Sequence, residues 1–368
     1  MPRSLRIPPT GAGRAGAGWA RHGLQLRRGG AELLLVFGSL LFLALVAALG
    51  ELAVRLFSDL NFLGNSRNLF VADAYGSSKG NAPNAKAISF GGVVYTDEHG
   101  FRVPKGGLPG DAQKSDAILV LGDSVAFGPA VEEPDTFVGR LRARFPNRRI
   151  YNSSVIGYAA SDYENVVDAF LPLHPEVSDV ALVFCLNDVS TTSAESIDRY
   201  LKDAKQGVPK QDLTETLRGF RLLSDANDFL RLHSKLYLLL KYQLLASQQR
   251  GWEEISRLYA DGSEADLDAT ARKIGEIAAE LKQKRVRFVV VLAPFEHQLS
   301  HPEDPASPVP QAKLAERLAR MGVPYVDPRP LFGRDRAGSD YYLPYDAMHF
   351  SKRGHQVMAD AIASALAH

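Results

Sequence analysis

The sequence predicts an α/β protein built on a parallel β-sheet that helices cover on both faces. Two observations lead to this class. Apolar runs rich in β-branched residues alternate with helical patterns over the second two thirds of the chain, and these runs are continuous, as in strands buried on both faces. The predicted strands are residues 117–121, 149–152, 180–186, 288–293 and 325–326. The predicted helices are residues 136–145, 161–173, 267–284, 313–321 and 352–367.

The composition is that of a globular protein, with 45% hydrophobic and 23% charged residues among 368. The net charge of +1 hides an asymmetry, because residues 1–30 contain six arginines and no acidic residue. The remaining chain holds 37 basic against 42 acidic residues. Binding of nucleic acid requires clustered cations, so this mildly acidic body does not predict a nucleic-acid partner. The only cysteine, Cys185, permits neither an intrachain disulfide nor a cysteine-based zinc site.

The N-terminal region predicts a membrane anchor over residues 31–50. Its central run, residues 33–49, is uncharged and apolar and spans about 25 Å as a helix. Arginines precede the run, which by the positive-inside rule places the N-terminus in the cytoplasm. The expected protein is therefore a single-pass protein of the cytoplasmic (inner) membrane, with the body of the chain in the periplasm or outside the cell. A cleaved signal peptide is the alternative, with a cleavage site at residues 46–48.

The expected organisation has four parts: a basic cytoplasmic tail over residues 1–30, the anchor over 31–50, a connecting segment over 51–115 and the α/β domain over 116–368. The connecting segment contains one strand-like stretch, residues 91–95. The α/β domain carries a helical insertion at about residues 190–266. Residues 227–250 predict a helix there, which either packs on the domain or serves as a lid or membrane-resting helix. In the second case Arg231, Lys235 and Lys241 lie near lipid headgroups.

Ser124 is the candidate nucleophile, because it follows a predicted strand directly and precedes a helix. In open parallel sheets the catalytic crevice lies beyond the carboxyl ends of the strands. The first backbone N–H groups of a helix at Ser124 can stabilise an oxyanion. Gly122 and Gly128 let the chain turn and approach a substrate closely. The motif alone also fits a helix cap with no catalytic role.

A second candidate group lies near the C-terminus, where Asp346 precedes His349 by three residues. At this spacing the carboxylate can orient the imidazole on a single loop. The histidine then acts as general base toward a serine and as general acid toward the leaving group. The alternative is a surface loop that ends in a helix cap.

Two further turns follow predicted strands at the same edge of the sheet. The backbone N–H of Gly157 and the side-chain amide of Asn187 are candidate oxyanion donors, in addition to the N–H of Ser124. Ordinary turn chemistry is the alternative, because asparagine and glycine also favour turns. Asp123 and Asp188 are candidates for supporting, hydrogen-bonding acids.

Together these motifs resemble the SGNH (GDSL-type) hydrolase family. Its first block matches Gly122, Asp123 and Ser124 with Gly128, and its second and third blocks match Gly157 and Asn187. Its fifth block, Asp-x-x-His, matches Asp346 and His349. The resemblance covers about residues 116–366. It implies a flavodoxin-like three-layer α/β/α fold and Ser-His-Asp ester chemistry without a metal or cofactor.

The sequence departs from the family pattern at two places. Cys185 stands where the third block usually has glycine, and the insertion after Asn187 is longer than in compact members. Residues 96–102, in the connecting segment, resemble a stretch found ahead of the domain in anchored bacterial relatives, with no role that the sequence reveals.

Three functions remain open at this point. The first is hydrolysis of an ester through an acyl-enzyme on Ser124. The second is an O-acyltransferase or deacetylase of an envelope polysaccharide that uses the same residues. The third is a non-catalytic binding module. The expected partners are the membrane, through residues 31–50, and an ester substrate, for which an acylated glycan or lipid is the candidate.

Overall fold

The computed structural model describes residues 18–108, 116–189, 221–245, 247–260, 264–333 and 337–367. These residues form two compact units, one ending at Ser58 and the other beginning at Asp59. Most of the predicted basic tail and residues 190–220 of the predicted insertion lie outside the described residues.

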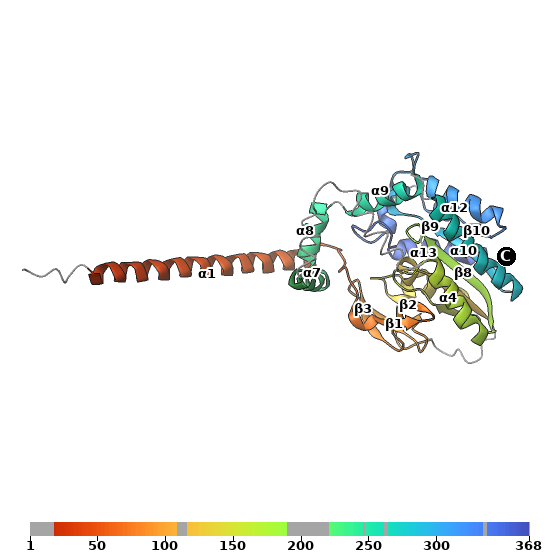
Figure 1. Cartoon of the computed structure of the whole chain (residues 1–368), viewed down its shortest axis with the longest axis horizontal. Helices are drawn as coiled ribbons and strands as arrows, with labels where there is room; N and C mark the ends of the chain where they lie inside the picture. Colours follow the sequence, from red (N-terminus) through yellow and green to blue (C-terminus); the bar gives the residue numbers. More distant parts are fainter. Residues whose placement is uncertain are drawn as a thin grey trace, which may run out of the picture. The chain divides into compact units, whose positions relative to one another are not determined.

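The first unit consists of one long helix, α1 (Gly18–Phe57), which Figure 1 shows as a single helix without a break. Within it, Glu32–Phe57 is long and apolar enough to cross a membrane, with a mean hydropathy of 2.7. Large apolar side chains such as Leu33, Phe42 and Phe57 are exposed. A signal sequence near an N-terminus has the same character, so the anchor remains a prediction.

The second unit is organised around a five-stranded sheet in the order β10-β9-β8-β6-β7. All neighbouring strands are parallel. Numbered along the chain from β6, this is the order 2-1-3-4-5 of flavodoxin-like folds. All five strands were predicted, and their ends differ from the prediction by at most three residues. They are β6 (Ala117–Gly122), β7 (Arg149–Asn152), β8 (Val177–Cys185), β9 (Arg287–Ala293) and β10 (Tyr325–Val326).

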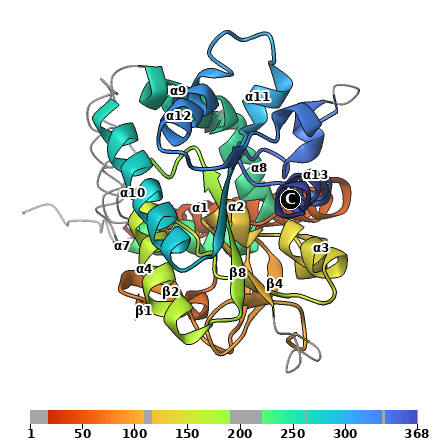
Figure 2. The same cartoon turned by 90° about the vertical axis from the view of Figure 1, so that its right-hand side faces the viewer.

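Helices cover both faces of this sheet, which confirms the predicted three-layer class (Figure 2). α3 (Phe137–Arg144) and α13 (Lys352–Leu366) lie on one face. α4 (Ala160–Phe170), α10 (Glu264–Gln283) and α12 (Val309–Arg320) lie on the other. The central strand β8 is buried on both sides and correspondingly reads as a continuous apolar run.

The insertion differs from the single helix predicted for residues 227–250. The chain there forms three helices: α7 (Arg221–His233), α8 (Lys235–Leu245) and α9 (Ser247–Ala260). The first break occurs at Ser234, whose hydroxyl accepts the N–H of Tyr237 and so begins a new helix. α9 packs on the main core through Trp252, Ile255 and Tyr259. For α9 the structure therefore supports packing on the domain.

The predicted connecting segment lies between the anchor and the α/β domain. Its described part within the second unit, residues 59–108, contains five strands where the sequence predicted one. Two antiparallel sheets form: β1 (Phe70–Ala74) with β2 (Ser77–Asn81), and β3 (Lys86–Ser89) with β4 (Gly92–Thr96) and β5 (Arg102–Val103). Leu69, Ala87 and Val94 form a small core with Phe127, which lies three residues after Ser124. This segment is thus packed against the proposed site.

Candidate active site

Ser124 lies at the carboxyl end of β6, at the first position of the short helix α2 (Ser124–Phe127). The Asp123 carboxylate caps this helix and accepts the N–H of Val125 at 2.8 Å. The turn requires glycine at position 122, because a Cβ atom there would lie 2.5 Å from the Cβ of Ala126 and 2.9 Å from the carbonyl oxygen of Val183. The strand end is therefore packed tightly enough to fix the position of the serine, which is 7% exposed.

The structure brings Asp346, His349 and Ser124 into one hydrogen-bonded chain. His349 Nε2 lies 2.8 Å from Ser124 Oγ, and His349 Nδ1 lies 2.8 Å from Asp346 Oδ2. The other oxygen of Asp346 accepts the backbone N–H groups of Met348 and His349, both at 2.9 Å. The carboxylate is thus fixed by the same loop whose imidazole it orients, as the spacing predicted.

The electrostatics of these three side chains favour an ionised Asp346 beside the imidazole of His349. Burial opposes ionisation of Asp346, but His349 and the N–H of Met348 lower the pKa of its carboxyl group below the ordinary value. Burial alone would lower the pKa of His349, yet the Asp346 carboxylate, together with Asp123, raises it above its ordinary value of 6.5. A proton on Nδ1 facing Asp346 leaves the Nε2 lone pair directed at Ser124.

The Ser124 hydroxyl has a second acceptor. Its Oγ lies 3.1 Å from Asp123 Oδ2, so a single hydroxyl hydrogen is shared between this carboxylate and His349. When His349 is protonated, its Nε2–H donates to Ser124, and the serine hydrogen then points to Asp123. Neutral His349 competes for that hydrogen, which is the arrangement that general-base chemistry requires.

Asp123 belongs to a buried carboxyl pair below the serine. Asp188 accepts the hydroxyl of Tyr163 at 2.7 Å and the N–H of Cys185 at 3.0 Å. Burial, together with the Asp123 carboxylate, raises the pKa of Asp188 well above its ordinary value. Asp188 thus joins the end of β8 to Tyr163 of α4, and Asp123 caps the helix that begins at Ser124, in line with a supporting function for both.

The candidate oxyanion donors lie on either side of β6. The turn that leads to Gly157 is fixed beside Ser124, because Ser153 and Val155 donate their N–H groups to the carbonyls of Val120 and Gly122. Asn187 follows the end of β8, the neighbour of β6 on the other side. Their use as oxyanion donors remains a prediction.

Neighbouring elements hold the histidine loop in ways that the sequence did not reveal. The ring of Phe90, in the turn between β3 and β4, meets the His349 ring edge-on at 5.2 Å. On the loop that carries Asp346, Tyr345 stacks on Tyr242 of α8 at 5.3 Å. The preceding segment and the insertion therefore both contact the loop of the candidate base.

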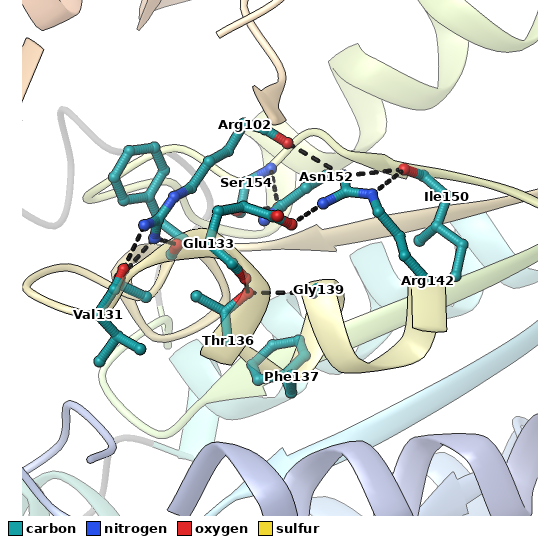
Figure 3. A network of polar contacts seen from close by, with 12 residues as sticks. Arg102, Val131, Glu133, Thr136, Phe137, Gly139, Arg142, Ile150, Asn152 and Ser154 are labelled. Atoms are coloured by element: carbon teal, nitrogen blue, oxygen red, sulfur yellow. Dashed lines mark hydrogen bonds and ion pairs between the residues drawn. The ribbon is translucent and has the colours of Figure 1, made fainter. Parts of the chain in front are cut away.

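Arg102 ties the preceding segment to the serine turn (Figure 3). Its side chain is fully buried, and its guanidinium donates to the backbone carbonyls of Phe127, Gly128 and Val131. Because it is buried, the pKa of Arg102 falls to about 9, so the group still carries its charge at neutral pH. Gly128, at φ 74°, ends α2 in the left-handed conformation, and its carbonyl is one of the three acceptors.

A second arginine extends this network toward β7. Arg142 forms an ion pair with the buried Glu133 and donates to the carbonyls of Arg102 and Ile150, at 3.1 and 2.9 Å (Figure 3). The stretch over residues 96–102, whose role the sequence left open, thus ends in a residue that fixes the backbone immediately after the candidate nucleophile.

Replacing Arg102 by methionine is expected to lower the free energy of unfolding by about 3 kcal/mol or more, because three buried carbonyls lose their donor. Arg102→Lys keeps the charge but loses the planar guanidinium group. Its free energy of unfolding should lie between that of Arg102→Met and that of the wild type. Thermal unfolding of the full-length chain in dodecyl maltoside measures the effect. The control is Arg144→Met, since Arg144 is half exposed. Equal melting temperatures for Arg102→Met and Arg144→Met would contradict this role for Arg102.

The titration of His349 provides a second prediction. Its pKa should lie above about 6.5 in the wild type and fall in Asp346→Asn, because the opposing effect of burial remains when the carboxylate charge is removed. NMR of the full-length chain labelled with ¹⁵N at histidine measures both values. Asp135→Asn is the control, because that carboxylate pairs with Arg140 and Lys352 at the surface. An unchanged pKa in Asp346→Asn would show that the two side chains are not coupled.

Comparison with known proteins identifies a family and several similar structures. The sequence model of the GDSL-like Lipase/Acylhydrolase family matches residues 120–357, nearly two thirds of the chain. No curated protein matches. Similar solved structures include an α/β hydrolase enzyme from the metagenome of Lake Arreo in Spain, at 17% identity over 68% of this chain and 94% of that chain, with a TM-score of 0.40. A lipolytic protein of the G-D-S-L family from Veillonella parvula is 13% identical over 68% and 98%, with a TM-score of 0.40.

An acetylxylan esterase from Geobacillus stearothermophilus is 13% identical over 68% of this chain and 93% of that chain, with a TM-score of 0.39. The resemblance of the motifs to SGNH hydrolases is confirmed by the family match, which spans most of the α/β domain. This chain belongs to the GDSL-like lipase/acylhydrolase family and is a hydrolase that acts on ester bonds.

Proposed function

We propose that the protein cleaves its ester through an acyl-enzyme on Ser124, outside the cytoplasmic membrane. The observation that carries this proposal is the continuous chain from Asp346 through His349 to Ser124, with both links at 2.8 Å. A serine hydroxyl is a weak nucleophile unless a positioned base removes its proton. Here the base, its orienting acid and the nucleophile lie within hydrogen-bonding distance before any substrate binds.

In the first half-reaction, Ser124 Oγ attacks the ester carbonyl carbon while His349 Nε2 takes the hydroxyl proton. The resulting oxyanion is stabilised by the N–H of Ser124, with the N–H of Gly157 and the amide of Asn187 as the other donors. Each such donor contributes roughly 3–4 kcal/mol at the transition state. When the tetrahedral intermediate collapses, His349 gives its proton to the departing alcohol, and the acyl group remains on Ser124.

In the second half-reaction, a water molecule replaces the alcohol. His349 takes a proton from this water as it attacks the acyl carbon, and the collapse of the second intermediate returns the proton to Ser124 Oγ. The products are one carboxylic acid and one alcohol, and the enzyme is regenerated. Asp346 stabilises the imidazolium that forms in each half-reaction without itself taking the proton.

The helix α1 supports a location at the membrane. With residues 31–50 in the bilayer and the arginine-rich tail in the cytoplasm, the hydrolase unit lies on the outer side of the inner membrane. An acylated glycan or lipid of the envelope is then the ester within reach.

Ser124→Ala is expected to lower kcat on an activated acetyl ester by roughly 10⁴- to 10⁶-fold, because the nucleophile is lost while the fold is kept. A fluorophosphonate probe should label the wild type and not this variant, since only an activated serine reacts. Ser153→Ala is the matched control, because Ser153 is also buried at this edge but donates to the carbonyl of Val120. Hydrolysis at the wild-type rate by Ser124→Ala would exclude the mechanism, and a wild type that resists the probe would favour a non-catalytic module.

The anchor predicts a mature protein that retains residues 31–50 and remains in the membrane fraction after alkaline carbonate extraction. Intact mass spectrometry of the membrane-bound protein should give the unprocessed chain. Protease added to spheroplasts should digest the hydrolase unit, while lysis should be needed to expose the tail. A mature N-terminus near Leu49 would instead identify a cleaved signal peptide.

A further inference from the structure

Lys79 reaches the edge of the candidate active site from the segment that precedes the main sheet. It lies on β2, and its ammonium group is close to Gly157, one of the candidate oxyanion donors. A methyl group placed on Gly157 would lie 3.0 Å from Lys79 Nζ. Gly157 in turn is two residues beyond Val155, which donates its N–H to the carbonyl of Gly122. The cation therefore borders the turn that carries Gly157, and this turn is hydrogen-bonded to the end of β6.

The backbone around Lys79 is held against this turn on both sides. The hydroxyl of Tyr158, the neighbour of Gly157, donates to the carbonyl of Lys79 at 2.8 Å. Two residues along β2, the Asn81 amide donates to the carbonyl of Ser154 at 3.0 Å. These bonds fix the backbone of Lys79 relative to the turn of Gly157, so the lysine side chain starts from a defined position beside it.

The ammonium of Lys79 forms no direct ion pair within the described part of the chain. Among the described residues, its ammonium has no hydrogen bond and no ion pair, and it lies 5.9 Å from the centre of the Phe70 ring. The residue is half-buried, and burial lowers the pKa of Lys79 while Asp162 acts in the opposite direction. Asp162 itself accepts the N–H of Ala159, at the start of α4. A half-buried ammonium that makes no direct ion pair is stabilised further when a ligand supplies an anion beside it.

We propose that Lys79 binds an anionic group of the substrate, a carboxylate or phosphate close to the ester bond. The proposal rests on the proposed function and adds the class of ester: the enzyme selects acyl esters that carry a negative charge beside the scissile bond. The body of the protein is acidic, with 37 basic against 42 acidic residues after residue 30, so it does not by itself attract anions. The positive charge of Lys79 then distinguishes anionic esters from neutral ones.

Two matched pairs of esters test this with the full-length chain in dodecyl maltoside. The first pair, 4-acetoxybenzoate and its methyl ester, differs by a charge on the alcohol. The second, mono(4-nitrophenyl) adipate and 4-nitrophenyl hexanoate, differs by a charge on the acyl chain. The wild type should show a higher kcat/KM for the anionic member of at least one pair, and this preference should shrink as ionic strength rises. The pair that responds identifies which side of the ester carries the anion.

Lys79→Met should lower kcat/KM for the preferred anionic ester roughly 10- to 100-fold and leave the neutral ester within about twofold. Lys79→Arg should retain the preference, because the charge is kept. Lys86→Met is the control, since Lys86 is exposed on the neighbouring β3. Melting temperatures show whether each variant folds. If Lys79→Met does not fold, Lys79→Arg still tests the proposal.

Two results would overturn the proposal: no preference of the wild type in either pair, or an equal loss on neutral and anionic esters in Lys79→Met. Fluorophosphonate labelling separates this failure from failure of the proposed function. If the wild type is labelled but shows no preference, only the assignment of Lys79 fails. If the wild type is not labelled and cleaves no ester, the proposed function fails and this inference falls with it.

Discussion

The hydrogen bond between His349 and Ser124 joins two side chains that are 225 positions apart in the sequence. Neither loop can hold this contact alone, since the serine follows the first strand of the sheet along the chain and the histidine precedes the last helix. The contact therefore depends on the parallel sheet, which brings the carboxyl ends of its strands to one edge. Tight packing at Gly122 fixes the end of β6, and Asp188 joins the end of β8 to α4.

Much of this architecture could be predicted from the sequence because its signals are local. The five strands of the main sheet are short β-branched runs, and the motifs around Ser124, Gly157, Asn187 and Asp346–His349 have fixed spacing. The strands of the preceding segment could not be found in the same way. β2, for example, consists of Ser-Ser-Lys-Gly-Asn, which has neither apolar alternation nor β-branched residues.

The remaining features depend on tertiary contacts. Arginine is rarely buried, so nothing in the sequence marks Arg102 as a core residue. The break at Ser234 depends on one hydroxyl that caps a helix in an otherwise helical pattern. The contact of Phe90 with His349 joins a hairpin turn to a loop far along the chain. Each of these involves a residue whose partner is set by the fold and not by its neighbours in sequence.

The fully buried Arg102 also has a consequence for where the enzyme begins as a folding unit. The family match starts at residue 120, yet the backbone just beyond it takes its hydrogen-bond donors from residue 102 and part of its apolar cover from Leu69, Ala87 and Val94. A chain cut at residue 116 would leave Phe127 uncovered and three carbonyls buried without donors. The compact unit therefore begins at Asp59, well before the family match, and the stretch between these two points is packed as part of the hydrolase unit.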